Sequence, residues 1–153
     1  LAGVTWVGLL YYFNFVQVPA MADALADEGG PGPAAIGKYV APRALLWFRM
    51  SAAVTWLTGA WALSLGYGFT NAFLLKPGAE MIGLGSWLGT IMLFNVWVLI
   101  WPNQKKILGM VEASAEEIAK AKFTAAMASR TNVVLSVPML LCMIGAGHGG
   151  YLF

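Results

Sequence analysis

Charge is scarce in this sequence, and that scarcity argues against a soluble globular protein. Charged residues make up 10% of the 153 residues, and apolar residues make up 59%. A soluble domain usually carries about 25% charged residues, so the composition favours a protein that lies in a lipid bilayer. The net charge of +2 is better explained by membrane topology than by nucleic acid, and no nucleic-acid partner is expected.

Cysteine and histidine each occur once, and this excludes several kinds of site. The single Cys142 allows no intramolecular disulfide and no cysteine-based metal or haem-attachment motif. The single His148 excludes ligation of a haem by two histidines of this chain. A haem b with at least one ligand outside the chain stays open, with His148 as a candidate ligand. The alternative is an interfacial histidine in a glycine-rich tail, and no metal site is expected.

The charged residues are absent altogether from four long stretches of the chain. Each stretch exceeds the roughly 20 helical residues that cross a hydrocarbon core about 30 Å thick. Because lipid offers no partners to the backbone, such stretches are expected to be helical. We therefore predict an all-α integral membrane bundle of four transmembrane helices that forms a single domain. The uncharged stretches are 1–22, 50–75, 81–104 and 131–153, and the predicted spans are about 1–20, 42–65, 81–101 and 124–145.

Glycine and proline predict where the spans end. The Gly-Gly-Pro-Gly-Pro stretch at 29–33 predicts a loop over 23–40, and a second connection is expected over 66–80. Pro102 is expected to stop the third span. The chain opens on Leu1 inside an apolar stretch, so further residues are expected to precede it.

The fourth span is predicted to extend beyond the membrane. Ser114 and Glu117 have the spacing of a capping box, which predicts a helix that begins at Ala115. The pattern continues without a break to about Gly145, so the first turns of this helix must project from the bilayer on its cytoplasmic side.

The basic residues predict the orientation of the chain. Eight of the nine lie in or beside the first and third connections, and only Lys76 lies in the second. By the positive-inside rule, the first and third connections are cytoplasmic. Both ends of the chain then face the outer, periplasmic side. The eight are Lys38, Arg43, Arg49, Lys105, Lys106, Lys120, Lys122 and Arg130.

Four polar side chains fall at one depth in the predicted spans: Asn14, Arg49, Asn95 and Asn132. They are consistent with interhelical hydrogen bonds or with a ligand or cofactor site, since polar groups within spans often mark function. We interpret Arg49 as organising this layer through a planar fork of hydrogen bonds to asparagines or backbone carbonyls. Gly85 and Gly89 form a GxxxG pattern, which predicts close approach of a neighbouring helix.

Four longer motifs carry a family resemblance and touch all four predicted spans. With them the chain resembles the urate oxidase N-terminal family, the membrane domain of bacterial membrane-bound urate hydroxylases. The resemblance implies a bacterial inner-membrane protein associated with electron transfer. Those enzymes end in a cytochrome c domain, and no such domain is expected within these 153 residues, which contain no CxxCH motif. The motifs are WVGLLYYFNFVQ (6–17), ALLWFR (44–49), NVWVLIWPNQKK (95–106) and SRTNVVLSVPM (129–139).

Three functions stay open. The first is an integral-membrane subunit of a larger electron-transfer complex, whether respiratory, photosynthetic or oxygenase, with other membrane subunits as partners. The second is a membrane oxidoreductase unit like the urate hydroxylases, with haem b as an open cofactor. The third is a small transporter. No Ser-His-Asp set and no carboxylate pair occurs within the spans, so no catalytic residue is assigned and the chain alone is not expected to be an enzyme.

Overall fold

The computed structural model describes residues 1–148, and within this range every regular element is a helix. The all-α part of the predicted fold class is therefore confirmed. Short π-helical turns, labelled η, lie between several α-helices of the same continuous segment. The elements are α1 (Ala2–Tyr12), η1 (Phe13–Gln17), α2 (Val18–Ala26), η2 (Ile36–Val40), α3 (Ala41–Leu65), α4 (Phe69–Phe73), α5 (Glu80–Phe94), η3 (Asn95–Ile100), α6 (Trp101–Ile107) and α7 (Ala115–Gly147).

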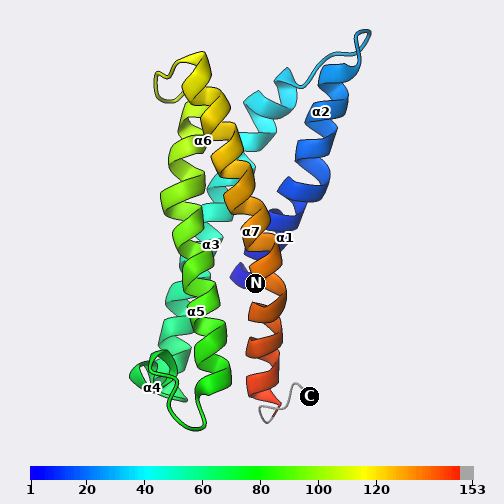
Figure 1. Ribbon diagram of the computed structural model, residues 1–153. Helices are drawn as coiled ribbons and strands as arrows, with labels where there is room; N and C mark the ends of the chain where they lie inside the picture. Colours follow the sequence, from blue (N-terminus) through cyan, green and yellow to red (C-terminus); the bar gives the residue numbers. More distant parts are fainter. Residues whose placement is uncertain (149–153) are drawn as a thin grey trace.

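Four long helical segments run side by side along the molecule (Figure 1). They pack most extensively as two pairs, α5 with α7 and α1 with α3, while the contacts between the pairs are fewer. Near the acidic loop at 27–33, α2 leans away from α6 and α7 (Figure 1), and none of its residues is buried. The bundle is therefore closed around its middle and open at this end.

Three prolines follow π-helical turns in the same way. Pro19, Pro42 and Pro102 each lie two residues beyond the last residue of η1, η2 and η3. The residue before each proline donates its N–H to the carbonyl five residues earlier, as Trp101 does to Val96. A proline in a regular α-helix lacks an N–H and clashes with the carbonyl four residues earlier. A π turn instead pairs an N–H with the carbonyl five residues earlier, which changes the position of that carbonyl relative to the proline.

These π turns correct two expectations on where helices end. Pro102 does not stop the third helix, which continues from Glu80 to Ile107. The first loop is shorter than 23–40, because α2 extends to Ala26 and η2 begins at Ile36. The second connection also contains the short helix α4, which packs against α5. A Cβ on Gly83 would collide with the backbone of Ala72, so glycine permits this contact.

The predicted start of the last helix is confirmed. Ser114 Oγ accepts from the Glu117 N–H at 3.2 Å, and the Glu117 carboxylate accepts from the Ser114 N–H at 2.9 Å. This capping box satisfies donors that a helix N-terminus leaves free. α7 then continues for 33 residues, through Pro138, to Gly147.

Two helices are long and apolar enough to cross a membrane: Glu80–Ile107 and Ala115–Gly147. The other two long segments are less apolar, since Asn14 and Gln17 lie in the first and Arg43 and Arg49 in the second. In the GxxxG pattern, a Cβ on Gly85 would lie 3.1 Å from Cys142 Cβ, so α5 and α7 approach closely there. Gly85 therefore serves packing within this chain, whereas a Cβ on Gly89 would meet no atom within 4 Å.

Candidate functional site

A row of polar side chains lies along one side of α7, at the centre of the molecule. Ser129, Asn132 and Ser136 follow helical spacing, and both Asn132 and Ser136 are fully buried. Residues three and four positions apart share a face of a helix. This face of α7 therefore meets both α1 on one side and α5 on the other.

Asn132 connects α7 to the third helical segment. Its Oδ1 accepts from Asn95 Nδ2 at 2.8 Å, and its Nδ2 donates to the carbonyl of Met92 at 3.0 Å. Asn95 is the first residue of η3. A π turn weakens the regular hydrogen-bonding pattern and often occurs at functional sites. The two predicted residues Asn95 and Asn132 are therefore direct partners.

Asn14 reaches α7 from the opposite side. Its Nδ2 donates to Ser129 Oγ at 2.7 Å and to the carbonyl of Leu10 at 2.8 Å. One turn earlier, the Tyr11 hydroxyl lies 3.1 Å from Ser136 Oγ. Like Asn95, Asn14 lies in a π turn, η1. The three asparagines thus all take part in one layer that α7 holds together.

Arg49 does not join this layer, and the predicted fork of hydrogen bonds to asparagines or backbone carbonyls is absent among residues 1–148. Its guanidinium carbon lies 3.7 Å from the centroid of the Trp101 ring, in a cation–π contact. Among residues 1–148, the guanidinium makes no hydrogen bond to an asparagine. Lys105 Nζ also approaches the Trp101 ring, at 5.8 Å from its centroid. The depth of a residue in a span predicts its level but not the direction in which its side chain points.

His148 lies far from the other predicted site residues. It follows the last turn of α7, where it is exposed and its Nδ1 lies 2.9 Å from the carbonyl of Ile144. Sixteen residues separate it from Asn132, or about 24 Å of helix. The structure therefore does not bring His148 together with the asparagine layer.

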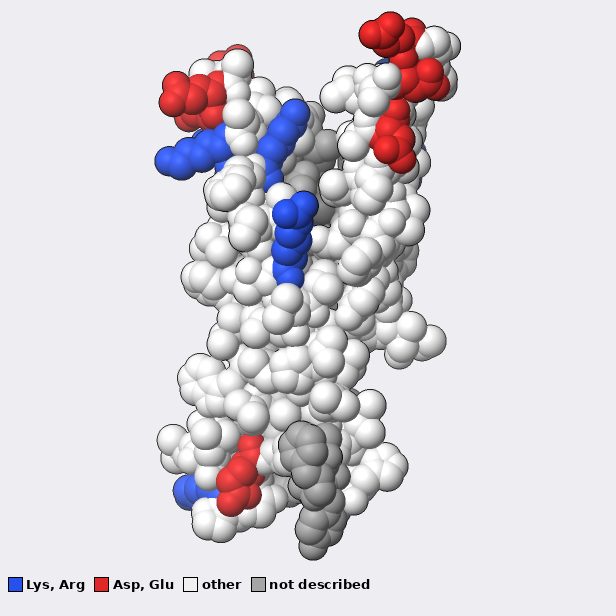
Figure 2. Space-filling model, turned by 45° about the vertical axis from the view of Figure 1, so that its right-hand side comes forward, with Lys and Arg blue, Asp and Glu red and all other residues white. Residues whose placement is uncertain are grey.

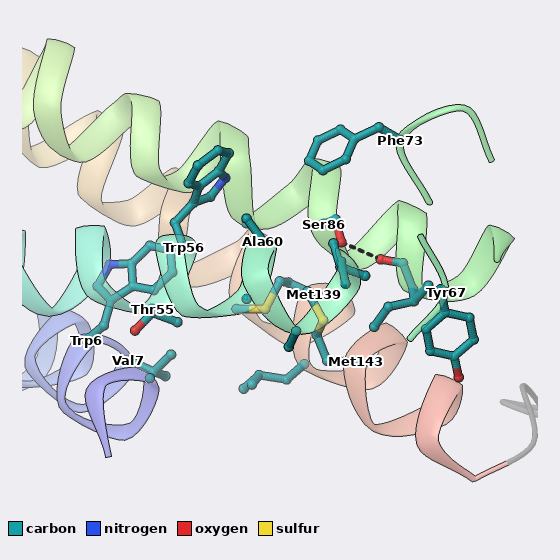
Figure 3. Close-up of a pocket in the computed structure, with 17 residues that line it drawn as sticks. Trp6, Val7, Thr55, Trp56, Ala60, Tyr67, Phe73, Ser86, Met139 and Met143 are labelled. Carbon is teal, nitrogen blue, oxygen red and sulfur yellow. Dashed lines mark hydrogen bonds between the residues drawn. The ribbon is translucent and has the colours of Figure 1, made fainter. Parts of the chain in front are cut away.

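A cavity of about 370 Å³ lies between the helices, and the sequence analysis did not predict it. Figure 3 shows aromatic side chains of α1, α3 and α4 and two methionines of α7 around it, with Ser86 of α5 in the wall. Volumes of about 300–1,000 Å³ are typical of ligand pockets. The sequence feature that could have indicated this cavity is the set of small residues in its wall: Gly3, Gly59, Ala60 and Gly89.

The donor set of this cavity does not fit haem b. Met139 and Met143 offer thioether sulfurs, and methionine serves as an axial ligand beside histidine in cytochromes c. No histidine lines the cavity, however, and no lysine or arginine is present there to pair with the propionates. Within residues 1–148, no group of three or more His, Cys, Asp or Glu side chains could hold a metal ion.

Two further polar groups of the interior were missed by sequence analysis. Trp6 Nε1 and Gln17 Oε1 are buried without a hydrogen-bond partner among the described residues. Gln17 ends η1, three residues beyond Asn14, and is 7% exposed. Its proximity in sequence to Asn14 was the available signal, since positions three apart share a helix face.

Taken together, the fold and the asparagine layer define a small all-helical protein with two helices that could cross a membrane. The sequence model described as urate oxidase N-terminal matches residues 66–153, more than half of the chain. The chain belongs to the urate oxidase N-terminal family, as its motifs predicted. A search of curated proteins and a search of solved structures each found no match.

Proposed function

We propose that this chain is a four-span integral membrane protein that acts as a helical subunit of a larger electron-transfer complex. The observation that carries the membrane location is a zone without charge around the middle of the molecule. On the face in Figure 2, most charged side chains lie toward the two ends, one basic side chain reaches toward the middle, and the zone below it carries no charge. Leu57, Trp61 and Val134 are each more than 60% exposed, a pattern that suits contact with lipid or with other membrane helices.

The proposal of four spans rests on length and packing. The first segment runs as continuous helix from Ala2 to Ala26, and α3 contains 25 residues. At 1.5 Å per residue, 25 residues extend about 38 Å, enough to cross a core about 30 Å thick. Both segments pack beside helices that could span a membrane, so the four are proposed to cross it together.

The proposed role as a subunit is supported by surfaces that this chain leaves uncovered. None of the residues of α2 is buried, and Val18 and Leu25 are 54% and 76% exposed. These exposed apolar side chains suit contact with a helix of another membrane protein. The buried polar groups of the described interior are amides, hydroxyls and an indole, and these suit structural hydrogen bonds better than acid–base chemistry.

The basic residues support an orientation with both ends periplasmic, in the bacterial inner membrane that the family resemblance implies. Lys105 and Lys106 lie in the last turn of α6, beside the N-terminus of α7. Lys76 lies in the connection at the other end. We therefore propose that the α6–α7 connection faces the cytoplasm.

The experiment is purification of the tagged chain from its native membranes in mild detergent. We expect it to stay in the membrane pellet after alkaline carbonate extraction and to migrate in native gels with subunits of a redox complex. Extraction into the soluble fraction would contradict the membrane location. A chain that migrates alone in every mild detergent would contradict the role as a subunit.

A second candidate is an oxidoreductase unit, which the family's description as urate oxidase N-terminal favours. The described cavity lacks a suitable donor set for haem, so a haem held by this chain would have to bind through other residues. A visible absorbance spectrum of the purified chain distinguishes the candidates. A haem band that survives removal of every partner would support this second function.

A further inference from the structure

The cavity lies where the two helix pairs separate. The pair α1–α3 forms one side of it and the pair α5–α7 the other, near the end of the bundle that carries α4 (Figure 3). Glycine leaves the space open: a Cβ on Gly59 or on Gly89 would meet no atom within 4 Å. Gly89 is nevertheless buried, so the space beside it is interior space.

Most polar side chains of the cavity wall already form hydrogen bonds within the protein. The hydroxyls of Thr55, Ser86 and Tyr67 all donate to backbone carbonyls, and the Trp56 indole N–H donates to Thr90 Oγ1. Only the Trp6 indole N–H lacks an acceptor among the described residues. The wall therefore presents carbon and sulfur to whatever occupies the cavity.

These properties select the chemistry of the occupant. A buried water needs two to four polar partners, and this wall offers almost none. An empty cavity leaves its lining atoms without dispersion contacts and is destabilising. A hydrocarbon chain satisfies both conditions, because it fills the volume and requires no hydrogen bond.

We propose that this cavity binds the hydrocarbon tail of a membrane lipid, either an acyl chain or an isoprenoid chain. Met139 and Met143 lie one turn apart on α7, and their flexible thioethers adapt to a mobile chain. The wall on α3 extends from Thr55 to Leu63, about 12 Å of helix.

The polar end of the lipid is expected near α4. Tyr67 and Phe73 line this end of the cavity, and the Tyr67 hydroxyl donates to the carbonyl of Ala146 at 2.9 Å. Tyrosine is typical of the headgroup level of a bilayer. This inference rests on the proposed membrane location, which delivers the lipid to the cavity.

The test uses palmitic acid that carries a photoreactive diazirine at the end of its chain. Membranes containing the protein are irradiated, and labelled peptides are identified by mass spectrometry. We expect label on the peptide of α7 that contains Met139 and Met143. Gly89→Leu and Gly59→Leu fill the space and favour helix, so they should reduce this label roughly tenfold.

The matched control is Gly8→Leu, because a Cβ on Gly8 also meets no atom within 4 Å but Gly8 does not line the cavity. It should leave the label unchanged. Excess unlabelled palmitate and excess geranylgeraniol are then tested as competitors. Displacement of the label by palmitate indicates an acyl occupant, and displacement by geranylgeraniol indicates an isoprenoid occupant. Equal labelling of Gly89→Leu and the parent, or displacement by neither compound, would overturn the proposal.

Failure of this inference is distinguishable from failure of the membrane location. Carbonate extraction of the same irradiated membranes reports on the location whether or not the label is found. A protein that stays in the pellet without cavity label is a membrane protein with no lipid at this site.

Discussion

At the scale of single residues, the asparagine layer shows how one helix can hold two others. Asn132 is fully buried and uses both ends of its amide, toward Asn95 and toward the carbonyl of Met92. Removal of one partner from such a pair leaves a buried polar group unsatisfied, which costs more than the bond itself contributes. The layer is thus sensitive to single changes on α7.

We therefore expect Asn132→Leu to lower the free energy of unfolding by about 2 kcal/mol. Asn103→Leu is the control, since Asn103 bonds only to the carbonyl of Leu99 within its own segment. The measurement is thermal unfolding in detergent for both variants. Equal midpoints for the two would show that the Asn95–Asn132 bond contributes nothing to stability.

The contact of Arg49 with Trp101 leads to a second prediction. Arg49→Lys removes the planar guanidinium that stacks on the indole and should cost about 1 kcal/mol. Arg43→Lys should cost less, because Arg43 is exposed and bonds only to the carbonyl of Tyr39. Thermal unfolding checks both, and in a Trp101→Leu background the cost of Arg49→Lys should disappear. A cost that persists there would assign Arg49 another partner.

At the scale of helices, α5 packs closely against a neighbouring helix at one glycine and borders the cavity at another. α5 carries Gly83 against the backbone of α4 and Gly89 beside the cavity. The two glycines thus differ in what a methyl group would meet, although both lie within one helix.

Gly83→Ala is expected to destabilise the protein, because its Cβ would collide with the Ala72 backbone. Gly89→Ala should instead stabilise it by up to about 1 kcal/mol, since alanine is the better helix former and meets no atom there. Unfolding midpoints of the two variants should move in opposite directions. Shifts of the same sign would contradict the packing of α4 on α5.

The start of α7 should respond to pH. The pKa of Glu117 lies below its ordinary value of 4.5, first because the Ser114 N–H donates to its carboxylate and then because Lys106 is near. The Lys106 Nζ to Glu117 Oε1 distance is 3.6 Å. A lowered pKa in the folded state means that the capping box stabilises the helix above the ordinary pKa. This stabilisation is lost as pH falls through the lowered value.

We expect the amide resonances of Ser114 and Glu117 to shift together as pH falls below about 4.5 and the first turn to fray. The measurement is an NMR titration in micelles. In Glu117→Gln the coupled shift should be absent. Titration of Glu117 above 4.5 would mean that the carboxylate is not held by the cap.

At the scale of the whole molecule, the charged ends and the uncharged middle lead to a prediction of topology. In a Cys142→Ser background, Lys76→Cys should react with an impermeant maleimide added outside intact cells. Lys105→Cys should react only after the cells are opened, because basic connections stay on the cytoplasmic side. Reaction of position 105 in intact cells would reverse the proposed orientation.

Much of the helical architecture could be predicted from local chemistry. The capping box at Ser114 predicted the first residue of α7, because a cap depends only on residues three positions apart. Long stretches without charge likewise predicted long helices. The prediction that Pro102 ends the third helix was wrong, because a π turn precedes this proline and the helix continues. No local sequence pattern predicted that turn.

What the sequence by itself determined is therefore the helices, their polar residues and the family. Only the tertiary structure decided that Asn95 bonds to Asn132 and Asn14 to Ser129, while Arg49 turns to Trp101. It also decided that the helix pairs separate around a cavity. The physical reason is that helical periodicity sets spacing along one axis, whereas the rotation of each helix about that axis depends on the side chains of all its neighbours.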